Sequence, residues 1–249
     1  MTPLGVGILG AGAATQAIHL PTVAALADRL RVRQVMDTDP DVAARVAATA
    51  GARWTTRAAE VLEDPDVDIV VVASPPGAHA EQVIAACAAG RRAVLCEKPL
   101  ATSRDEARLM LDAARSAGTP VLAGTMHAYD PACRAAVAAW RSAGYQAALV
   151  RSRINLPADD VYIRAATQPL SDPPPWTRPP RPWAPGAAAA FITDIMLGLV
   201  IHDIPLVREF LPEAGPVTSA ATPEPIGYAL TARCGAGDGA GPVSYTHLT

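Results

Sequence analysis

Short, entirely apolar segments alternate with helical patterns over the first half of this chain, and this alternation restricts the fold more than any other feature. A strand that is apolar at every position is buried on both faces, and strands joined by helices run parallel to one another. The sequence therefore predicts an α/β domain with a doubly wound parallel sheet. The predicted strands are Leu4–Leu9, Val32–Met36, Ile69–Val72, Ala93–Cys96 and Pro120–Gly124. The predicted helices are Ala13–Ala27, Pro40–Ala50, Ala78–Ala89 and one that runs to Ala117 from a capping box at Ser103 and Glu106.

The pattern changes beyond Tyr129, and we place a domain boundary near Gly124. We expect one domain over residues 1–124 and a second domain, with its own sheet, over residues 125–249. Residues Pro157–Pro185 contain nine prolines and are predicted to form a loop. The other elements predicted for the second domain are helices over Tyr129–Ala143 and Ala188–Leu211 and strands over Ala147–Ile154, Pro216–Ala221 and Ile226–Arg233.

The composition excludes several classes of protein. Hydrophobic residues make up 50% of the 249 residues, which is ample for a packed core, and the net charge of −3 gives no basic footprint for nucleic acid. Apolar stretches of about 18 residues or more are all interrupted by a charge, proline or histidine, so no membrane span is expected. The start of the chain has no positive residue before Arg29, so we expect no signal peptide and a cytoplasmic protein. The four cysteines lack metal-ligand spacing, so reduced thiols and no metal site are expected.

The first predicted strand runs directly into a glycine turn of the kind that binds dinucleotides. Gly10 permits the tight turn from strand to helix, and Gly12 lets backbone amides approach a pyrophosphate. The pyrophosphate would rest on the positive end of the helix that begins at Ala13 and Ala14. Thr15 stands at the place of the usual third glycine. Because G-x-G alone is a weak signal, its position between a strand and a helix carries the prediction.

Asp37 ends the second predicted strand, 25 residues after Gly12. A carboxylate near this place binds the ribose hydroxyls of NAD, and it would repel the 2′-phosphate of NADP. No arginine follows in Thr38-Asp39-Pro40, so the sequence favours NAD over NADP. The alternative for Asp37 is a turn residue before Asp39.

Lys98 is the only lysine among 21 basic residues, and the other 20 are arginines. A surface charge tolerates exchange of lysine for arginine, whereas a proton-transfer group does not, because arginine stays charged in proteins. Lys98 is therefore the first candidate for acid–base catalysis. It stands in the tripeptide Glu97-Lys98-Pro99, directly after the fourth apolar run of the predicted strands. The alternative is a single surface lysine left by chance.

Two further segments join this tripeptide to form a pattern. Ser74-Pro75-Pro76, with His79, follows the strand Ile69–Val72, and Gly198-Leu199-Val200-Ile201-His202-Asp203 lies in the late apolar helix. Together the three segments resemble the Gfo/Idh/MocA family of glucose-fructose oxidoreductase, inositol dehydrogenase and MocA. The resemblance implies a Rossmann domain followed by an α+β domain with an open, mainly antiparallel sheet. It also assigns Ser74, Pro75, His79, Glu97 and Lys98 to the cofactor site.

The resemblance implies an NAD(P)-dependent oxidoreductase that transfers a hydride between a nicotinamide cofactor and a hydroxyl or carbonyl carbon. The substrate class that it implies is a sugar, cyclitol or related polyol. Lys98 and His202 match the family's catalytic residues, which handle the proton of the substrate hydroxyl. One alternative keeps the fold but reduces a carbonyl group outside sugar chemistry.

The chain departs from the family pattern one helical turn before His202. The family commonly has an aspartate four residues before this histidine, and here the residue is Gly198. Asp203, next to the histidine, is a candidate substrate residue instead. The departure motivates a second alternative, a dinucleotide-binding sensor or regulatory protein without turnover.

Four further residues are candidates for the substrate site. His127 stands where the family usually has an arginine, and Tyr129 follows it as a residue that either binds substrate or packs. Trp176 and Trp183 lie in the proline-rich segment, where an indole could cover a sugar face or anchor the loop. The full-length protein is expected to be a homo-oligomer, because family members usually associate through the sheet of the second domain.

The last seven residues, Val243–Thr249, show neither strand alternation nor a helix cap. They match one reading frame of a transposon-derived sequencing adapter. We expect them to be non-native, and the chain to be a fragment that is truncated at its C-terminal end. The alternative is an ordinary C-terminal tail.

Overall fold

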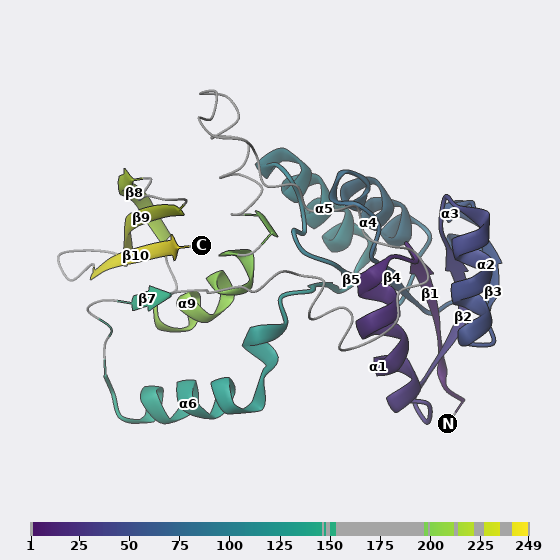
Figure 1. Ribbon diagram of the computed structural model, residues 1–249, viewed down its shortest axis with the longest axis horizontal. Helices are drawn as coiled ribbons and strands as arrows, with labels where there is room; N and C mark the ends of the chain where they lie inside the picture. Colours follow the sequence, from purple (N-terminus) through teal and green to yellow (C-terminus); the bar gives the residue numbers. More distant parts are fainter. Residues whose placement is uncertain are drawn as a thin grey trace. The chain divides into compact units, whose positions relative to one another are not determined.

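Figure 1 shows the computed structural model of the chain. It describes residues 2–145, 147, 150–152, 197–198, 200–211, 214–221, 227–234 and 241–248. These residues fall into two compact units, of which the first ends at Gly124 and the second begins at Thr125. Each unit is described by itself.

The first unit is built on a sheet of six strands. They are β1 (Leu4–Leu9), β2 (Leu30–Met36), β3 (Arg53–Thr55), β4 (Ile69–Val72), β5 (Ala93–Cys96) and β6 (Val121–Ala123). Their order is β3-β2-β1-β4-β5-β6, and every neighbouring pair is parallel. The strand order reverses between β1 and β4, as it does in doubly wound sheets that bind dinucleotides. The predicted α/β fold with a parallel sheet is confirmed.

Helices pack on both faces of this sheet. They are α1 (Leu20–Ala25), α2 (Pro40–Thr49), α3 (Ala58–Leu62), α4 (His79–Ala88) and α5 (Arg104–Ala117), with α4 and α5 side by side in Figure 1. In β4, Val71 belongs to the same buried hydrophobic cluster as Val46 of α2, whereas its neighbours Val70 and Val72 belong to the cluster that contains Val83 of α4. Successive side chains of a strand point to opposite faces, so the continuous apolar run of β4 is what burial on both faces requires.

Two short elements, β3 and α3, lie where the apolar pattern predicts no element. β3 is the edge strand of the sheet, and Arg53 and Trp54 are exposed there, Trp54 to 49%. Only Thr55 of this strand is buried, so no apolar run marks it in the sequence.

The first helix differs from the single helix predicted over Ala13–Ala27. A π-helix, η1 (Thr15–His19), comes first, and α1 continues from it. The amide of Leu20 donates to the carbonyl of Thr15, five residues back instead of four. Pro21 explains the wide turn, because its ring would clash with the carbonyl of Ala17 in a regular α-helix and it has no N–H to donate.

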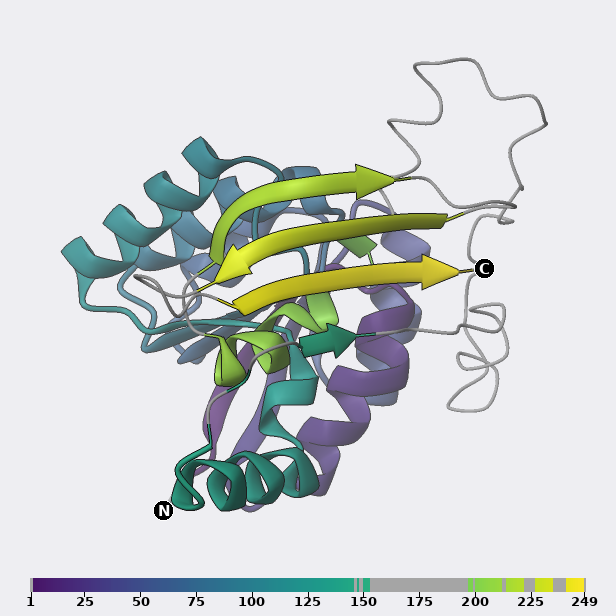
Figure 2. The ribbon, with the colours of Figure 1, turned by 90° about the vertical axis from the view of Figure 1, so that its left-hand side faces the viewer.

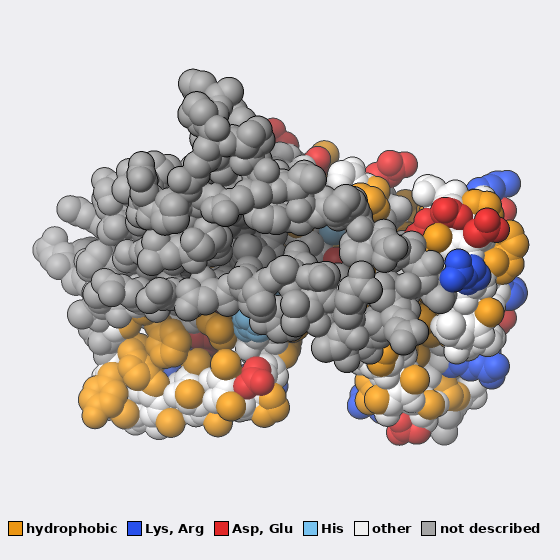
Figure 3. Space-filling model, in the orientation of Figure 1, with side chains coloured by type: hydrophobic (Ala, Val, Ile, Leu, Met, Phe, Trp, Pro, Cys, Tyr) orange, Lys and Arg blue, Asp and Glu red, His pale blue; other side chains and the backbone are white. Residues whose placement is uncertain are grey.

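The second unit contains a four-stranded sheet in the order β7-β10-β9-β8. These strands are β7 (Val150–Ser152), β8 (Ala214–Ala221), β9 (Gly227–Cys234) and β10 (Gly241–Leu248). β8, β9 and β10 are antiparallel neighbours, and β10 pairs in parallel with β7 on its other side, as Figure 2 shows. The helical segments that the structure describes here are η3 (Met126–Tyr129), α6 (Pro131–Ser142), η4 (Val200–His202) and α9 (Ile204–Phe210). The face of α6 visible in Figure 3 is mostly hydrophobic, in keeping with its many alanines.

One expectation for the second unit is wrong. The expected helix over Ala188–Leu211 is not continuous within its described part, because η4 is a 3₁₀ turn that ends at His202 before α9 begins. Pro205 accounts for the break, since its ring is incompatible with a helical carbonyl at Ile201. The heptapeptide Val243–Thr249 contributes all but its last residue to β10, and its non-native origin stays a prediction. The proline-rich segment, with Trp176 and Trp183, lies outside the described residues.

Candidate active site

The glycine turn lies at the carboxyl end of β1. Gly10 has a φ of +98°, and a Cβ atom there would lie 2.5 Å from the carbonyl oxygen of Ala73. A side chain is therefore excluded at Gly10 by both backbone conformation and space. A Cβ atom at Gly12 would meet no heavy atom of the described residues within 4 Å. The two glycines thus have different roles: Gly10 is required by the protein itself, whereas Gly12 leaves its backbone open to approach from outside.

Thr15 stabilises this turn from the place of the third glycine. Its hydroxyl donates to the carbonyl oxygen of Gly10 at 2.6 Å, and the side chain is fully buried. Ala14 precedes the π-helix as its N-cap residue, and Ala13 and Ala14 are both half-buried. The amides at this helix start are the groups that a pyrophosphate binds in such folds.

Asp37 lies directly after β2, as expected. Its Oδ2 atom accepts from the amide of Ala11 at 2.8 Å, and its Oδ1 atom accepts from the amide of Asp39 at 3.1 Å. The carboxylate is therefore held beside the glycine turn by backbone donors and remains half-buried. The sequence left open whether Asp37 serves the glycine turn or the turn before Asp39. In the structure its carboxylate accepts a hydrogen bond from each.

The candidate residues after β4 differ in burial, and the histidine among them is the most buried. Ser74 is half-buried, with its hydroxyl donating to Gln82 at 2.7 Å, and Pro75 is exposed. His79 is completely buried at the start of α4. Its Nδ1 lies 2.8 Å from the carbonyl oxygen of Pro99 and its Nε2 lies 2.8 Å from that of Ser74. Both ring nitrogens face protein carbonyl groups, so the expected role of the His79 side chain in cofactor binding does not fit, and it instead joins two loops.

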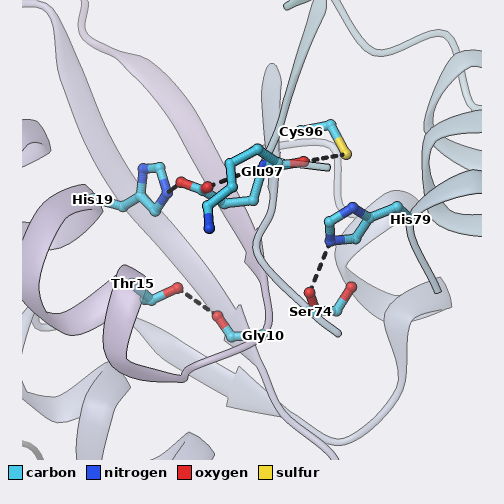
Figure 4. Close-up of polar contacts among 8 residues, drawn as sticks. Gly10, Thr15, His19, Ser74, His79, Cys96 and Glu97 are labelled. Carbon is cyan, nitrogen blue, oxygen red and sulfur yellow. Dashed lines mark hydrogen bonds and ion pairs between the residues drawn. The ribbon is translucent and has the colours of Figure 1, made fainter. Parts of the chain in front are cut away.

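Glu97 follows β5 and is anchored on several sides. Its amide donates to the carbonyl of Val72 at 2.8 Å, and its Oε2 accepts from the amide of Lys98 at 3.1 Å. Its Oε1 lies 2.9 Å from Nε2 of His19, the last residue of the π-helix. Figure 4 shows the His19 ring pointing at Glu97 from that helix. The peptide bond between Lys98 and Pro99 is cis.

These contacts decide the charge of Glu97. Burial raises the pKa of the Glu97 carboxyl, but the hydrogen bond and charge of His19, followed by the amide and charge of Lys98, outweigh it, and the pKa is lowered. The carboxylate therefore stays negative beside Lys98 at neutral pH. Burial, followed by the charge of Glu97, raises the pKa of the neighbouring Cys96 thiol to about 12, so this thiol stays protonated.

His19 is the residue of this site that the sequence reasoning missed. It is the last residue of the π-helix, buried nine positions after Gly10. A titratable residue on the buried side of the helix that follows a glycine turn was the available signal. A histidine alone does not indicate which carboxylate it meets.

In the second unit, three of the expected residues lie close together. Nδ1 of His127 lies 3.6 Å from a carboxylate oxygen of Asp203, and the rings of His127 and His202 are 5.3 Å apart between centroids. Asp203 is 14% exposed and His127 46% exposed at the side chain. Tyr129 is 58% exposed, so within the described residues it does not pack in a core.

Other kinds of site are not found in the described part of the chain. It contains no group of three or more histidine, cysteine or acidic residues that could hold a metal ion. No helix among the described residues is long and apolar enough to cross a membrane.

The parallel sheet, the open glycine turn and the carboxylate at the end of β2 define a dinucleotide-binding Rossmann domain. Residues 4–125 match the oxidoreductase family with an NAD-binding Rossmann fold known as Gfo/Idh/MocA. The resemblance drawn from the sequence is thereby confirmed for the matched residues, which make up just under half of the chain.

Two relatives of this half are dehydrogenases by name. The chain is 38% identical over 130 residues to inositol 2-dehydrogenase 3 of Saccharopolyspora erythraea, which is 52% of this chain and 38% of the relative. It is 37% identical over 123 residues to levoglucosan dehydrogenase of Pseudarthrobacter phenanthrenivorans, which is 46% of this chain and 31% of the relative. The chain thus matches well under half the length of either relative.

A solved structure extends the likeness over both units. The WlbA dehydrogenase of Bordetella pertussis, in complex with NADH and UDP-GlcNAcA, superposes with a TM-score of 0.72 at 20% identity. The likeness covers 98% of this chain and 70% of that one. At this identity it is evidence for the fold alone.

Proposed function

We propose that the protein is an NAD-dependent oxidoreductase that acts on a CH–OH group of a sugar, cyclitol or related polyol. The observation that carries the proposal is the position of Lys98. The only lysine of the chain follows β5 in the same unit as the glycine turn, and its neighbour Glu97 is bonded to the helix after that turn. The names of the inositol and levoglucosan dehydrogenases support the substrate class.

The residues of the first unit fit a bound dinucleotide. The backbone at Gly12 is open to a pyrophosphate, with Ala13 and Ala14 at the helix start beside it. Asp37 offers a fixed carboxylate to the ribose hydroxyls and a negative charge against a 2′-phosphate, which supports NAD over NADP. Ser74, Pro75 and Glu97 follow strands that end at the same edge of the sheet, and we propose that they line the cofactor site.

Bound NAD supplies the carbon, C4 of its nicotinamide ring, that accepts or returns the hydride. Oxidation of an alcohol also releases the hydroxyl proton, and this proton needs an acceptor near neutral pH. We assign that role to the amine of Lys98, because a lysine can exchange a proton whereas the arginines of this chain cannot.

The second unit supplies a further set of proton-handling groups. His202 is the second proposed catalytic residue, and His127 lies beside it with the Asp203 carboxylate near its Nδ1. An imidazole backed by a carboxylate is a common proton acceptor. We propose that His127 and Asp203 assist His202 within the second unit, since Gly198 contributes no side chain one helical turn before it. Tyr129 is exposed on the same turn as His127, and we propose that it contacts the substrate.

Gly198 also motivates the second candidate function, a dinucleotide-binding sensor. A Cβ atom at Gly198 would meet no heavy atom of the described residues within 4 Å, so the structure does not require glycine there for space. A regulatory protein of this kind would bind NAD tightly and would not turn over. The presence of Lys98 in a chain whose other 20 basic residues are arginines favours the enzyme over the sensor.

Three wider features belong to the same proposal. Residues 1–124 form the cofactor domain and residues 125–249 the substrate domain. The protein works in the cytoplasm, and in its full-length form it is a homo-oligomer. Sedimentation of the full-length gene product would test the last of these.

One experiment separates the two functions. NADH fluorescence titration measures cofactor binding, and NADH formation with a panel of polyols and sugars that includes myo-inositol and levoglucosan measures turnover. Binding with turnover on any member supports the enzyme. Binding without turnover across the panel would favour the sensor, and absence of binding would contradict both.

A further inference from the structure

The segment Glu97-Lys98-Pro99 is bonded to residues of two different helices, and neither bond belongs to the sheet. His19, from the π-helix after the glycine turn, bonds the side chain of Glu97 at 2.9 Å. His79, from α4, bonds the carbonyl oxygen of Pro99 at 2.8 Å. Lys98 therefore stands between two residues that are each fixed by a buried histidine.

We propose that His19 is a positioning residue for Lys98: acting through Glu97, it fixes the segment that carries the lysine to the helix that follows the dinucleotide turn. The link itself is independent of activity. Its importance for catalysis rests on the proposed function, in which Lys98 transfers the proton.

The contact between His19 and Glu97 is a buried one, so its loss has consequences. His19 is 7% exposed and the Glu97 side chain 14% exposed. When a buried carboxylate loses its donor, no interaction offsets the free-energy cost of its desolvation. The carboxylate then either takes up a proton or moves toward solvent. Both outcomes disturb Glu97 at the point where its other oxygen holds the amide of Lys98.

Glu97 has little room to adjust on the side of β6. A Cβ atom at Gly124 would lie 3.2 Å from both the Cα and the Oε2 of Glu97, so the backbone after β6 passes close to Glu97. The amide of Gly124 also donates to the carbonyl of Cys96 at 2.7 Å. With the backbone held on that side, the contact to His19 decides the direction of the carboxylate.

The other end of the link reaches the glycine turn. Thr15 and His19 are the first and last residues of the same π-helix. The hydroxyl of Thr15 is bonded to the carbonyl of Gly10 at 2.6 Å, and Figure 4 shows this bond and the Glu97 contact at the two ends of the helix. The π-helix therefore connects Gly10, which is bonded to Thr15, with the Glu97 carboxylate next to Lys98, which is bonded to His19. π-Helical turns are often found at functional sites.

The chain offers a direct readout, because Lys98 is its only lysine and the amino terminus its only other primary amine. The test is the rate at which the N-hydroxysuccinimide ester of acetic acid acetylates Lys98, followed by mass spectrometry of the peptide that contains it. The reagent needs neither cofactor nor substrate. His19→Leu removes the donor, and His19→Gln keeps an N–H that can reach Glu97.

We expect His19→Leu to accelerate acetylation of Lys98 by about threefold or more, the scale set by loss of one hydrogen bond. His19→Gln should return the rate most of the way to that of the parent. The control is Thr119→Val, which removes another hydrogen bond of a buried side chain in the same unit. This bond runs from the Thr119 hydroxyl to the carbonyl of Arg91 at 3.0 Å, before the amino ends of β5 and β6, whereas Glu97 follows the carboxyl end of β5. The acetylation rate of Thr119→Val should equal that of the parent.

Should His19→Leu fail to fold, Glu97→Gln supplies the same test, since it keeps the shape of the side chain and removes its charge. Acetylation at the parent rate in the folded His19 and Glu97 variants would overturn the proposal, as would an equal acceleration in Thr119→Val. NADH titration of the same proteins reports on the proposed function separately: a parent that binds no NADH contradicts that function and leaves the acetylation result standing.

Discussion

Gly10 and Gly12 are two residues apart, yet the structure predicts opposite consequences for the same substitution to alanine. At Gly10 the φ of +98° is a conformation that L-residues rarely adopt, which costs about 1–3 kcal/mol. The new methyl group would also overlap the carbonyl of Ala73, and overpacking costs a further ~1–3 kcal/mol. We therefore expect Gly10→Ala to lose about 2–6 kcal/mol of unfolding free energy, a large share of the 5–15 kcal/mol typical of a domain.

Gly12→Ala should leave the free energy of unfolding within about 0.5 kcal/mol of the parent, because the methyl group meets no atom of the described residues within 4 Å. It would instead stand where a pyrophosphate approaches the backbone. We expect the dissociation constant of NADH to rise about tenfold or more, equivalent to about 1.4 kcal/mol of binding free energy.

The two assays are urea denaturation, which gives the unfolding free energy, and NADH fluorescence titration. The two variants serve as controls for each other, since both add one methyl group to the same turn. A Gly10→Ala protein as stable as the parent would refute the reasoning for the turn. A Gly12→Ala protein that binds NADH as tightly as the parent would refute the placement of the pyrophosphate.

Three further predictions concern the charged residues of the site. Lys98→Arg should keep the fold and NADH binding but reduce turnover by about 10²-fold or more, since arginine cannot take up the proton; steady-state kinetics on the panel substrate that the parent oxidises measures it, and turnover equal to the parent would remove Lys98 from the mechanism. Asp37→Ser should narrow the preference for NAD by improving NADP binding, as parallel titrations would show, and tighter NADP than NAD binding by the parent would contradict the role of the carboxylate. The pKa of Glu97 is lowered in the folded protein, so its contribution to stability is complete above the unfolded pKa near 4.5 and is lost as the pH falls through the folded value; the stability difference between the parent and Glu97→Gln should therefore shrink in urea melts below about pH 4.5, and a difference that grows with acid would be inconsistent with the sign of the shift.

Local signals in the sequence predicted the first unit well. The run Ile69–Val72 is apolar at every position and forms β4 with the same bounds, because burial on both faces leaves no other composition. Ser103 caps α5 as expected, accepting from the amide of Glu106 at 3.2 Å. Gly10 and Asp37 are bonded to the same turn region from two strand ends, as the strand–turn–helix pattern implies.

What the sequence could not show depends on contacts between distant segments. The family resemblance assigned His79 to the cofactor site, yet its ring is buried between carbonyl groups of two loops. The bond from His19 to Glu97 spans 78 positions, and no local pattern reports it. β3 is short and mostly exposed at the sheet edge, and α3, with five residues, is too short to carry a periodic signal. In the second unit, Pro205 was the local signal for the end of η4, and the apolar periodicity around it concealed the break.

The wide turn at Thr15–His19 has a consequence for changes in chain length. A regular α-helix rotates by about 100° per residue, so a helix that has absorbed one residue in a π turn carries a fixed offset between the segments on either side. Deletion of Ala17 would remove one residue from this turn, and it would rotate His19 by about that angle relative to either the glycine turn or α1. The histidine would then miss Glu97, although every residue of the dinucleotide turn and of the segment around Lys98 would be unchanged. The number of residues in this turn, as well as their identity, decides whether the two segments are joined.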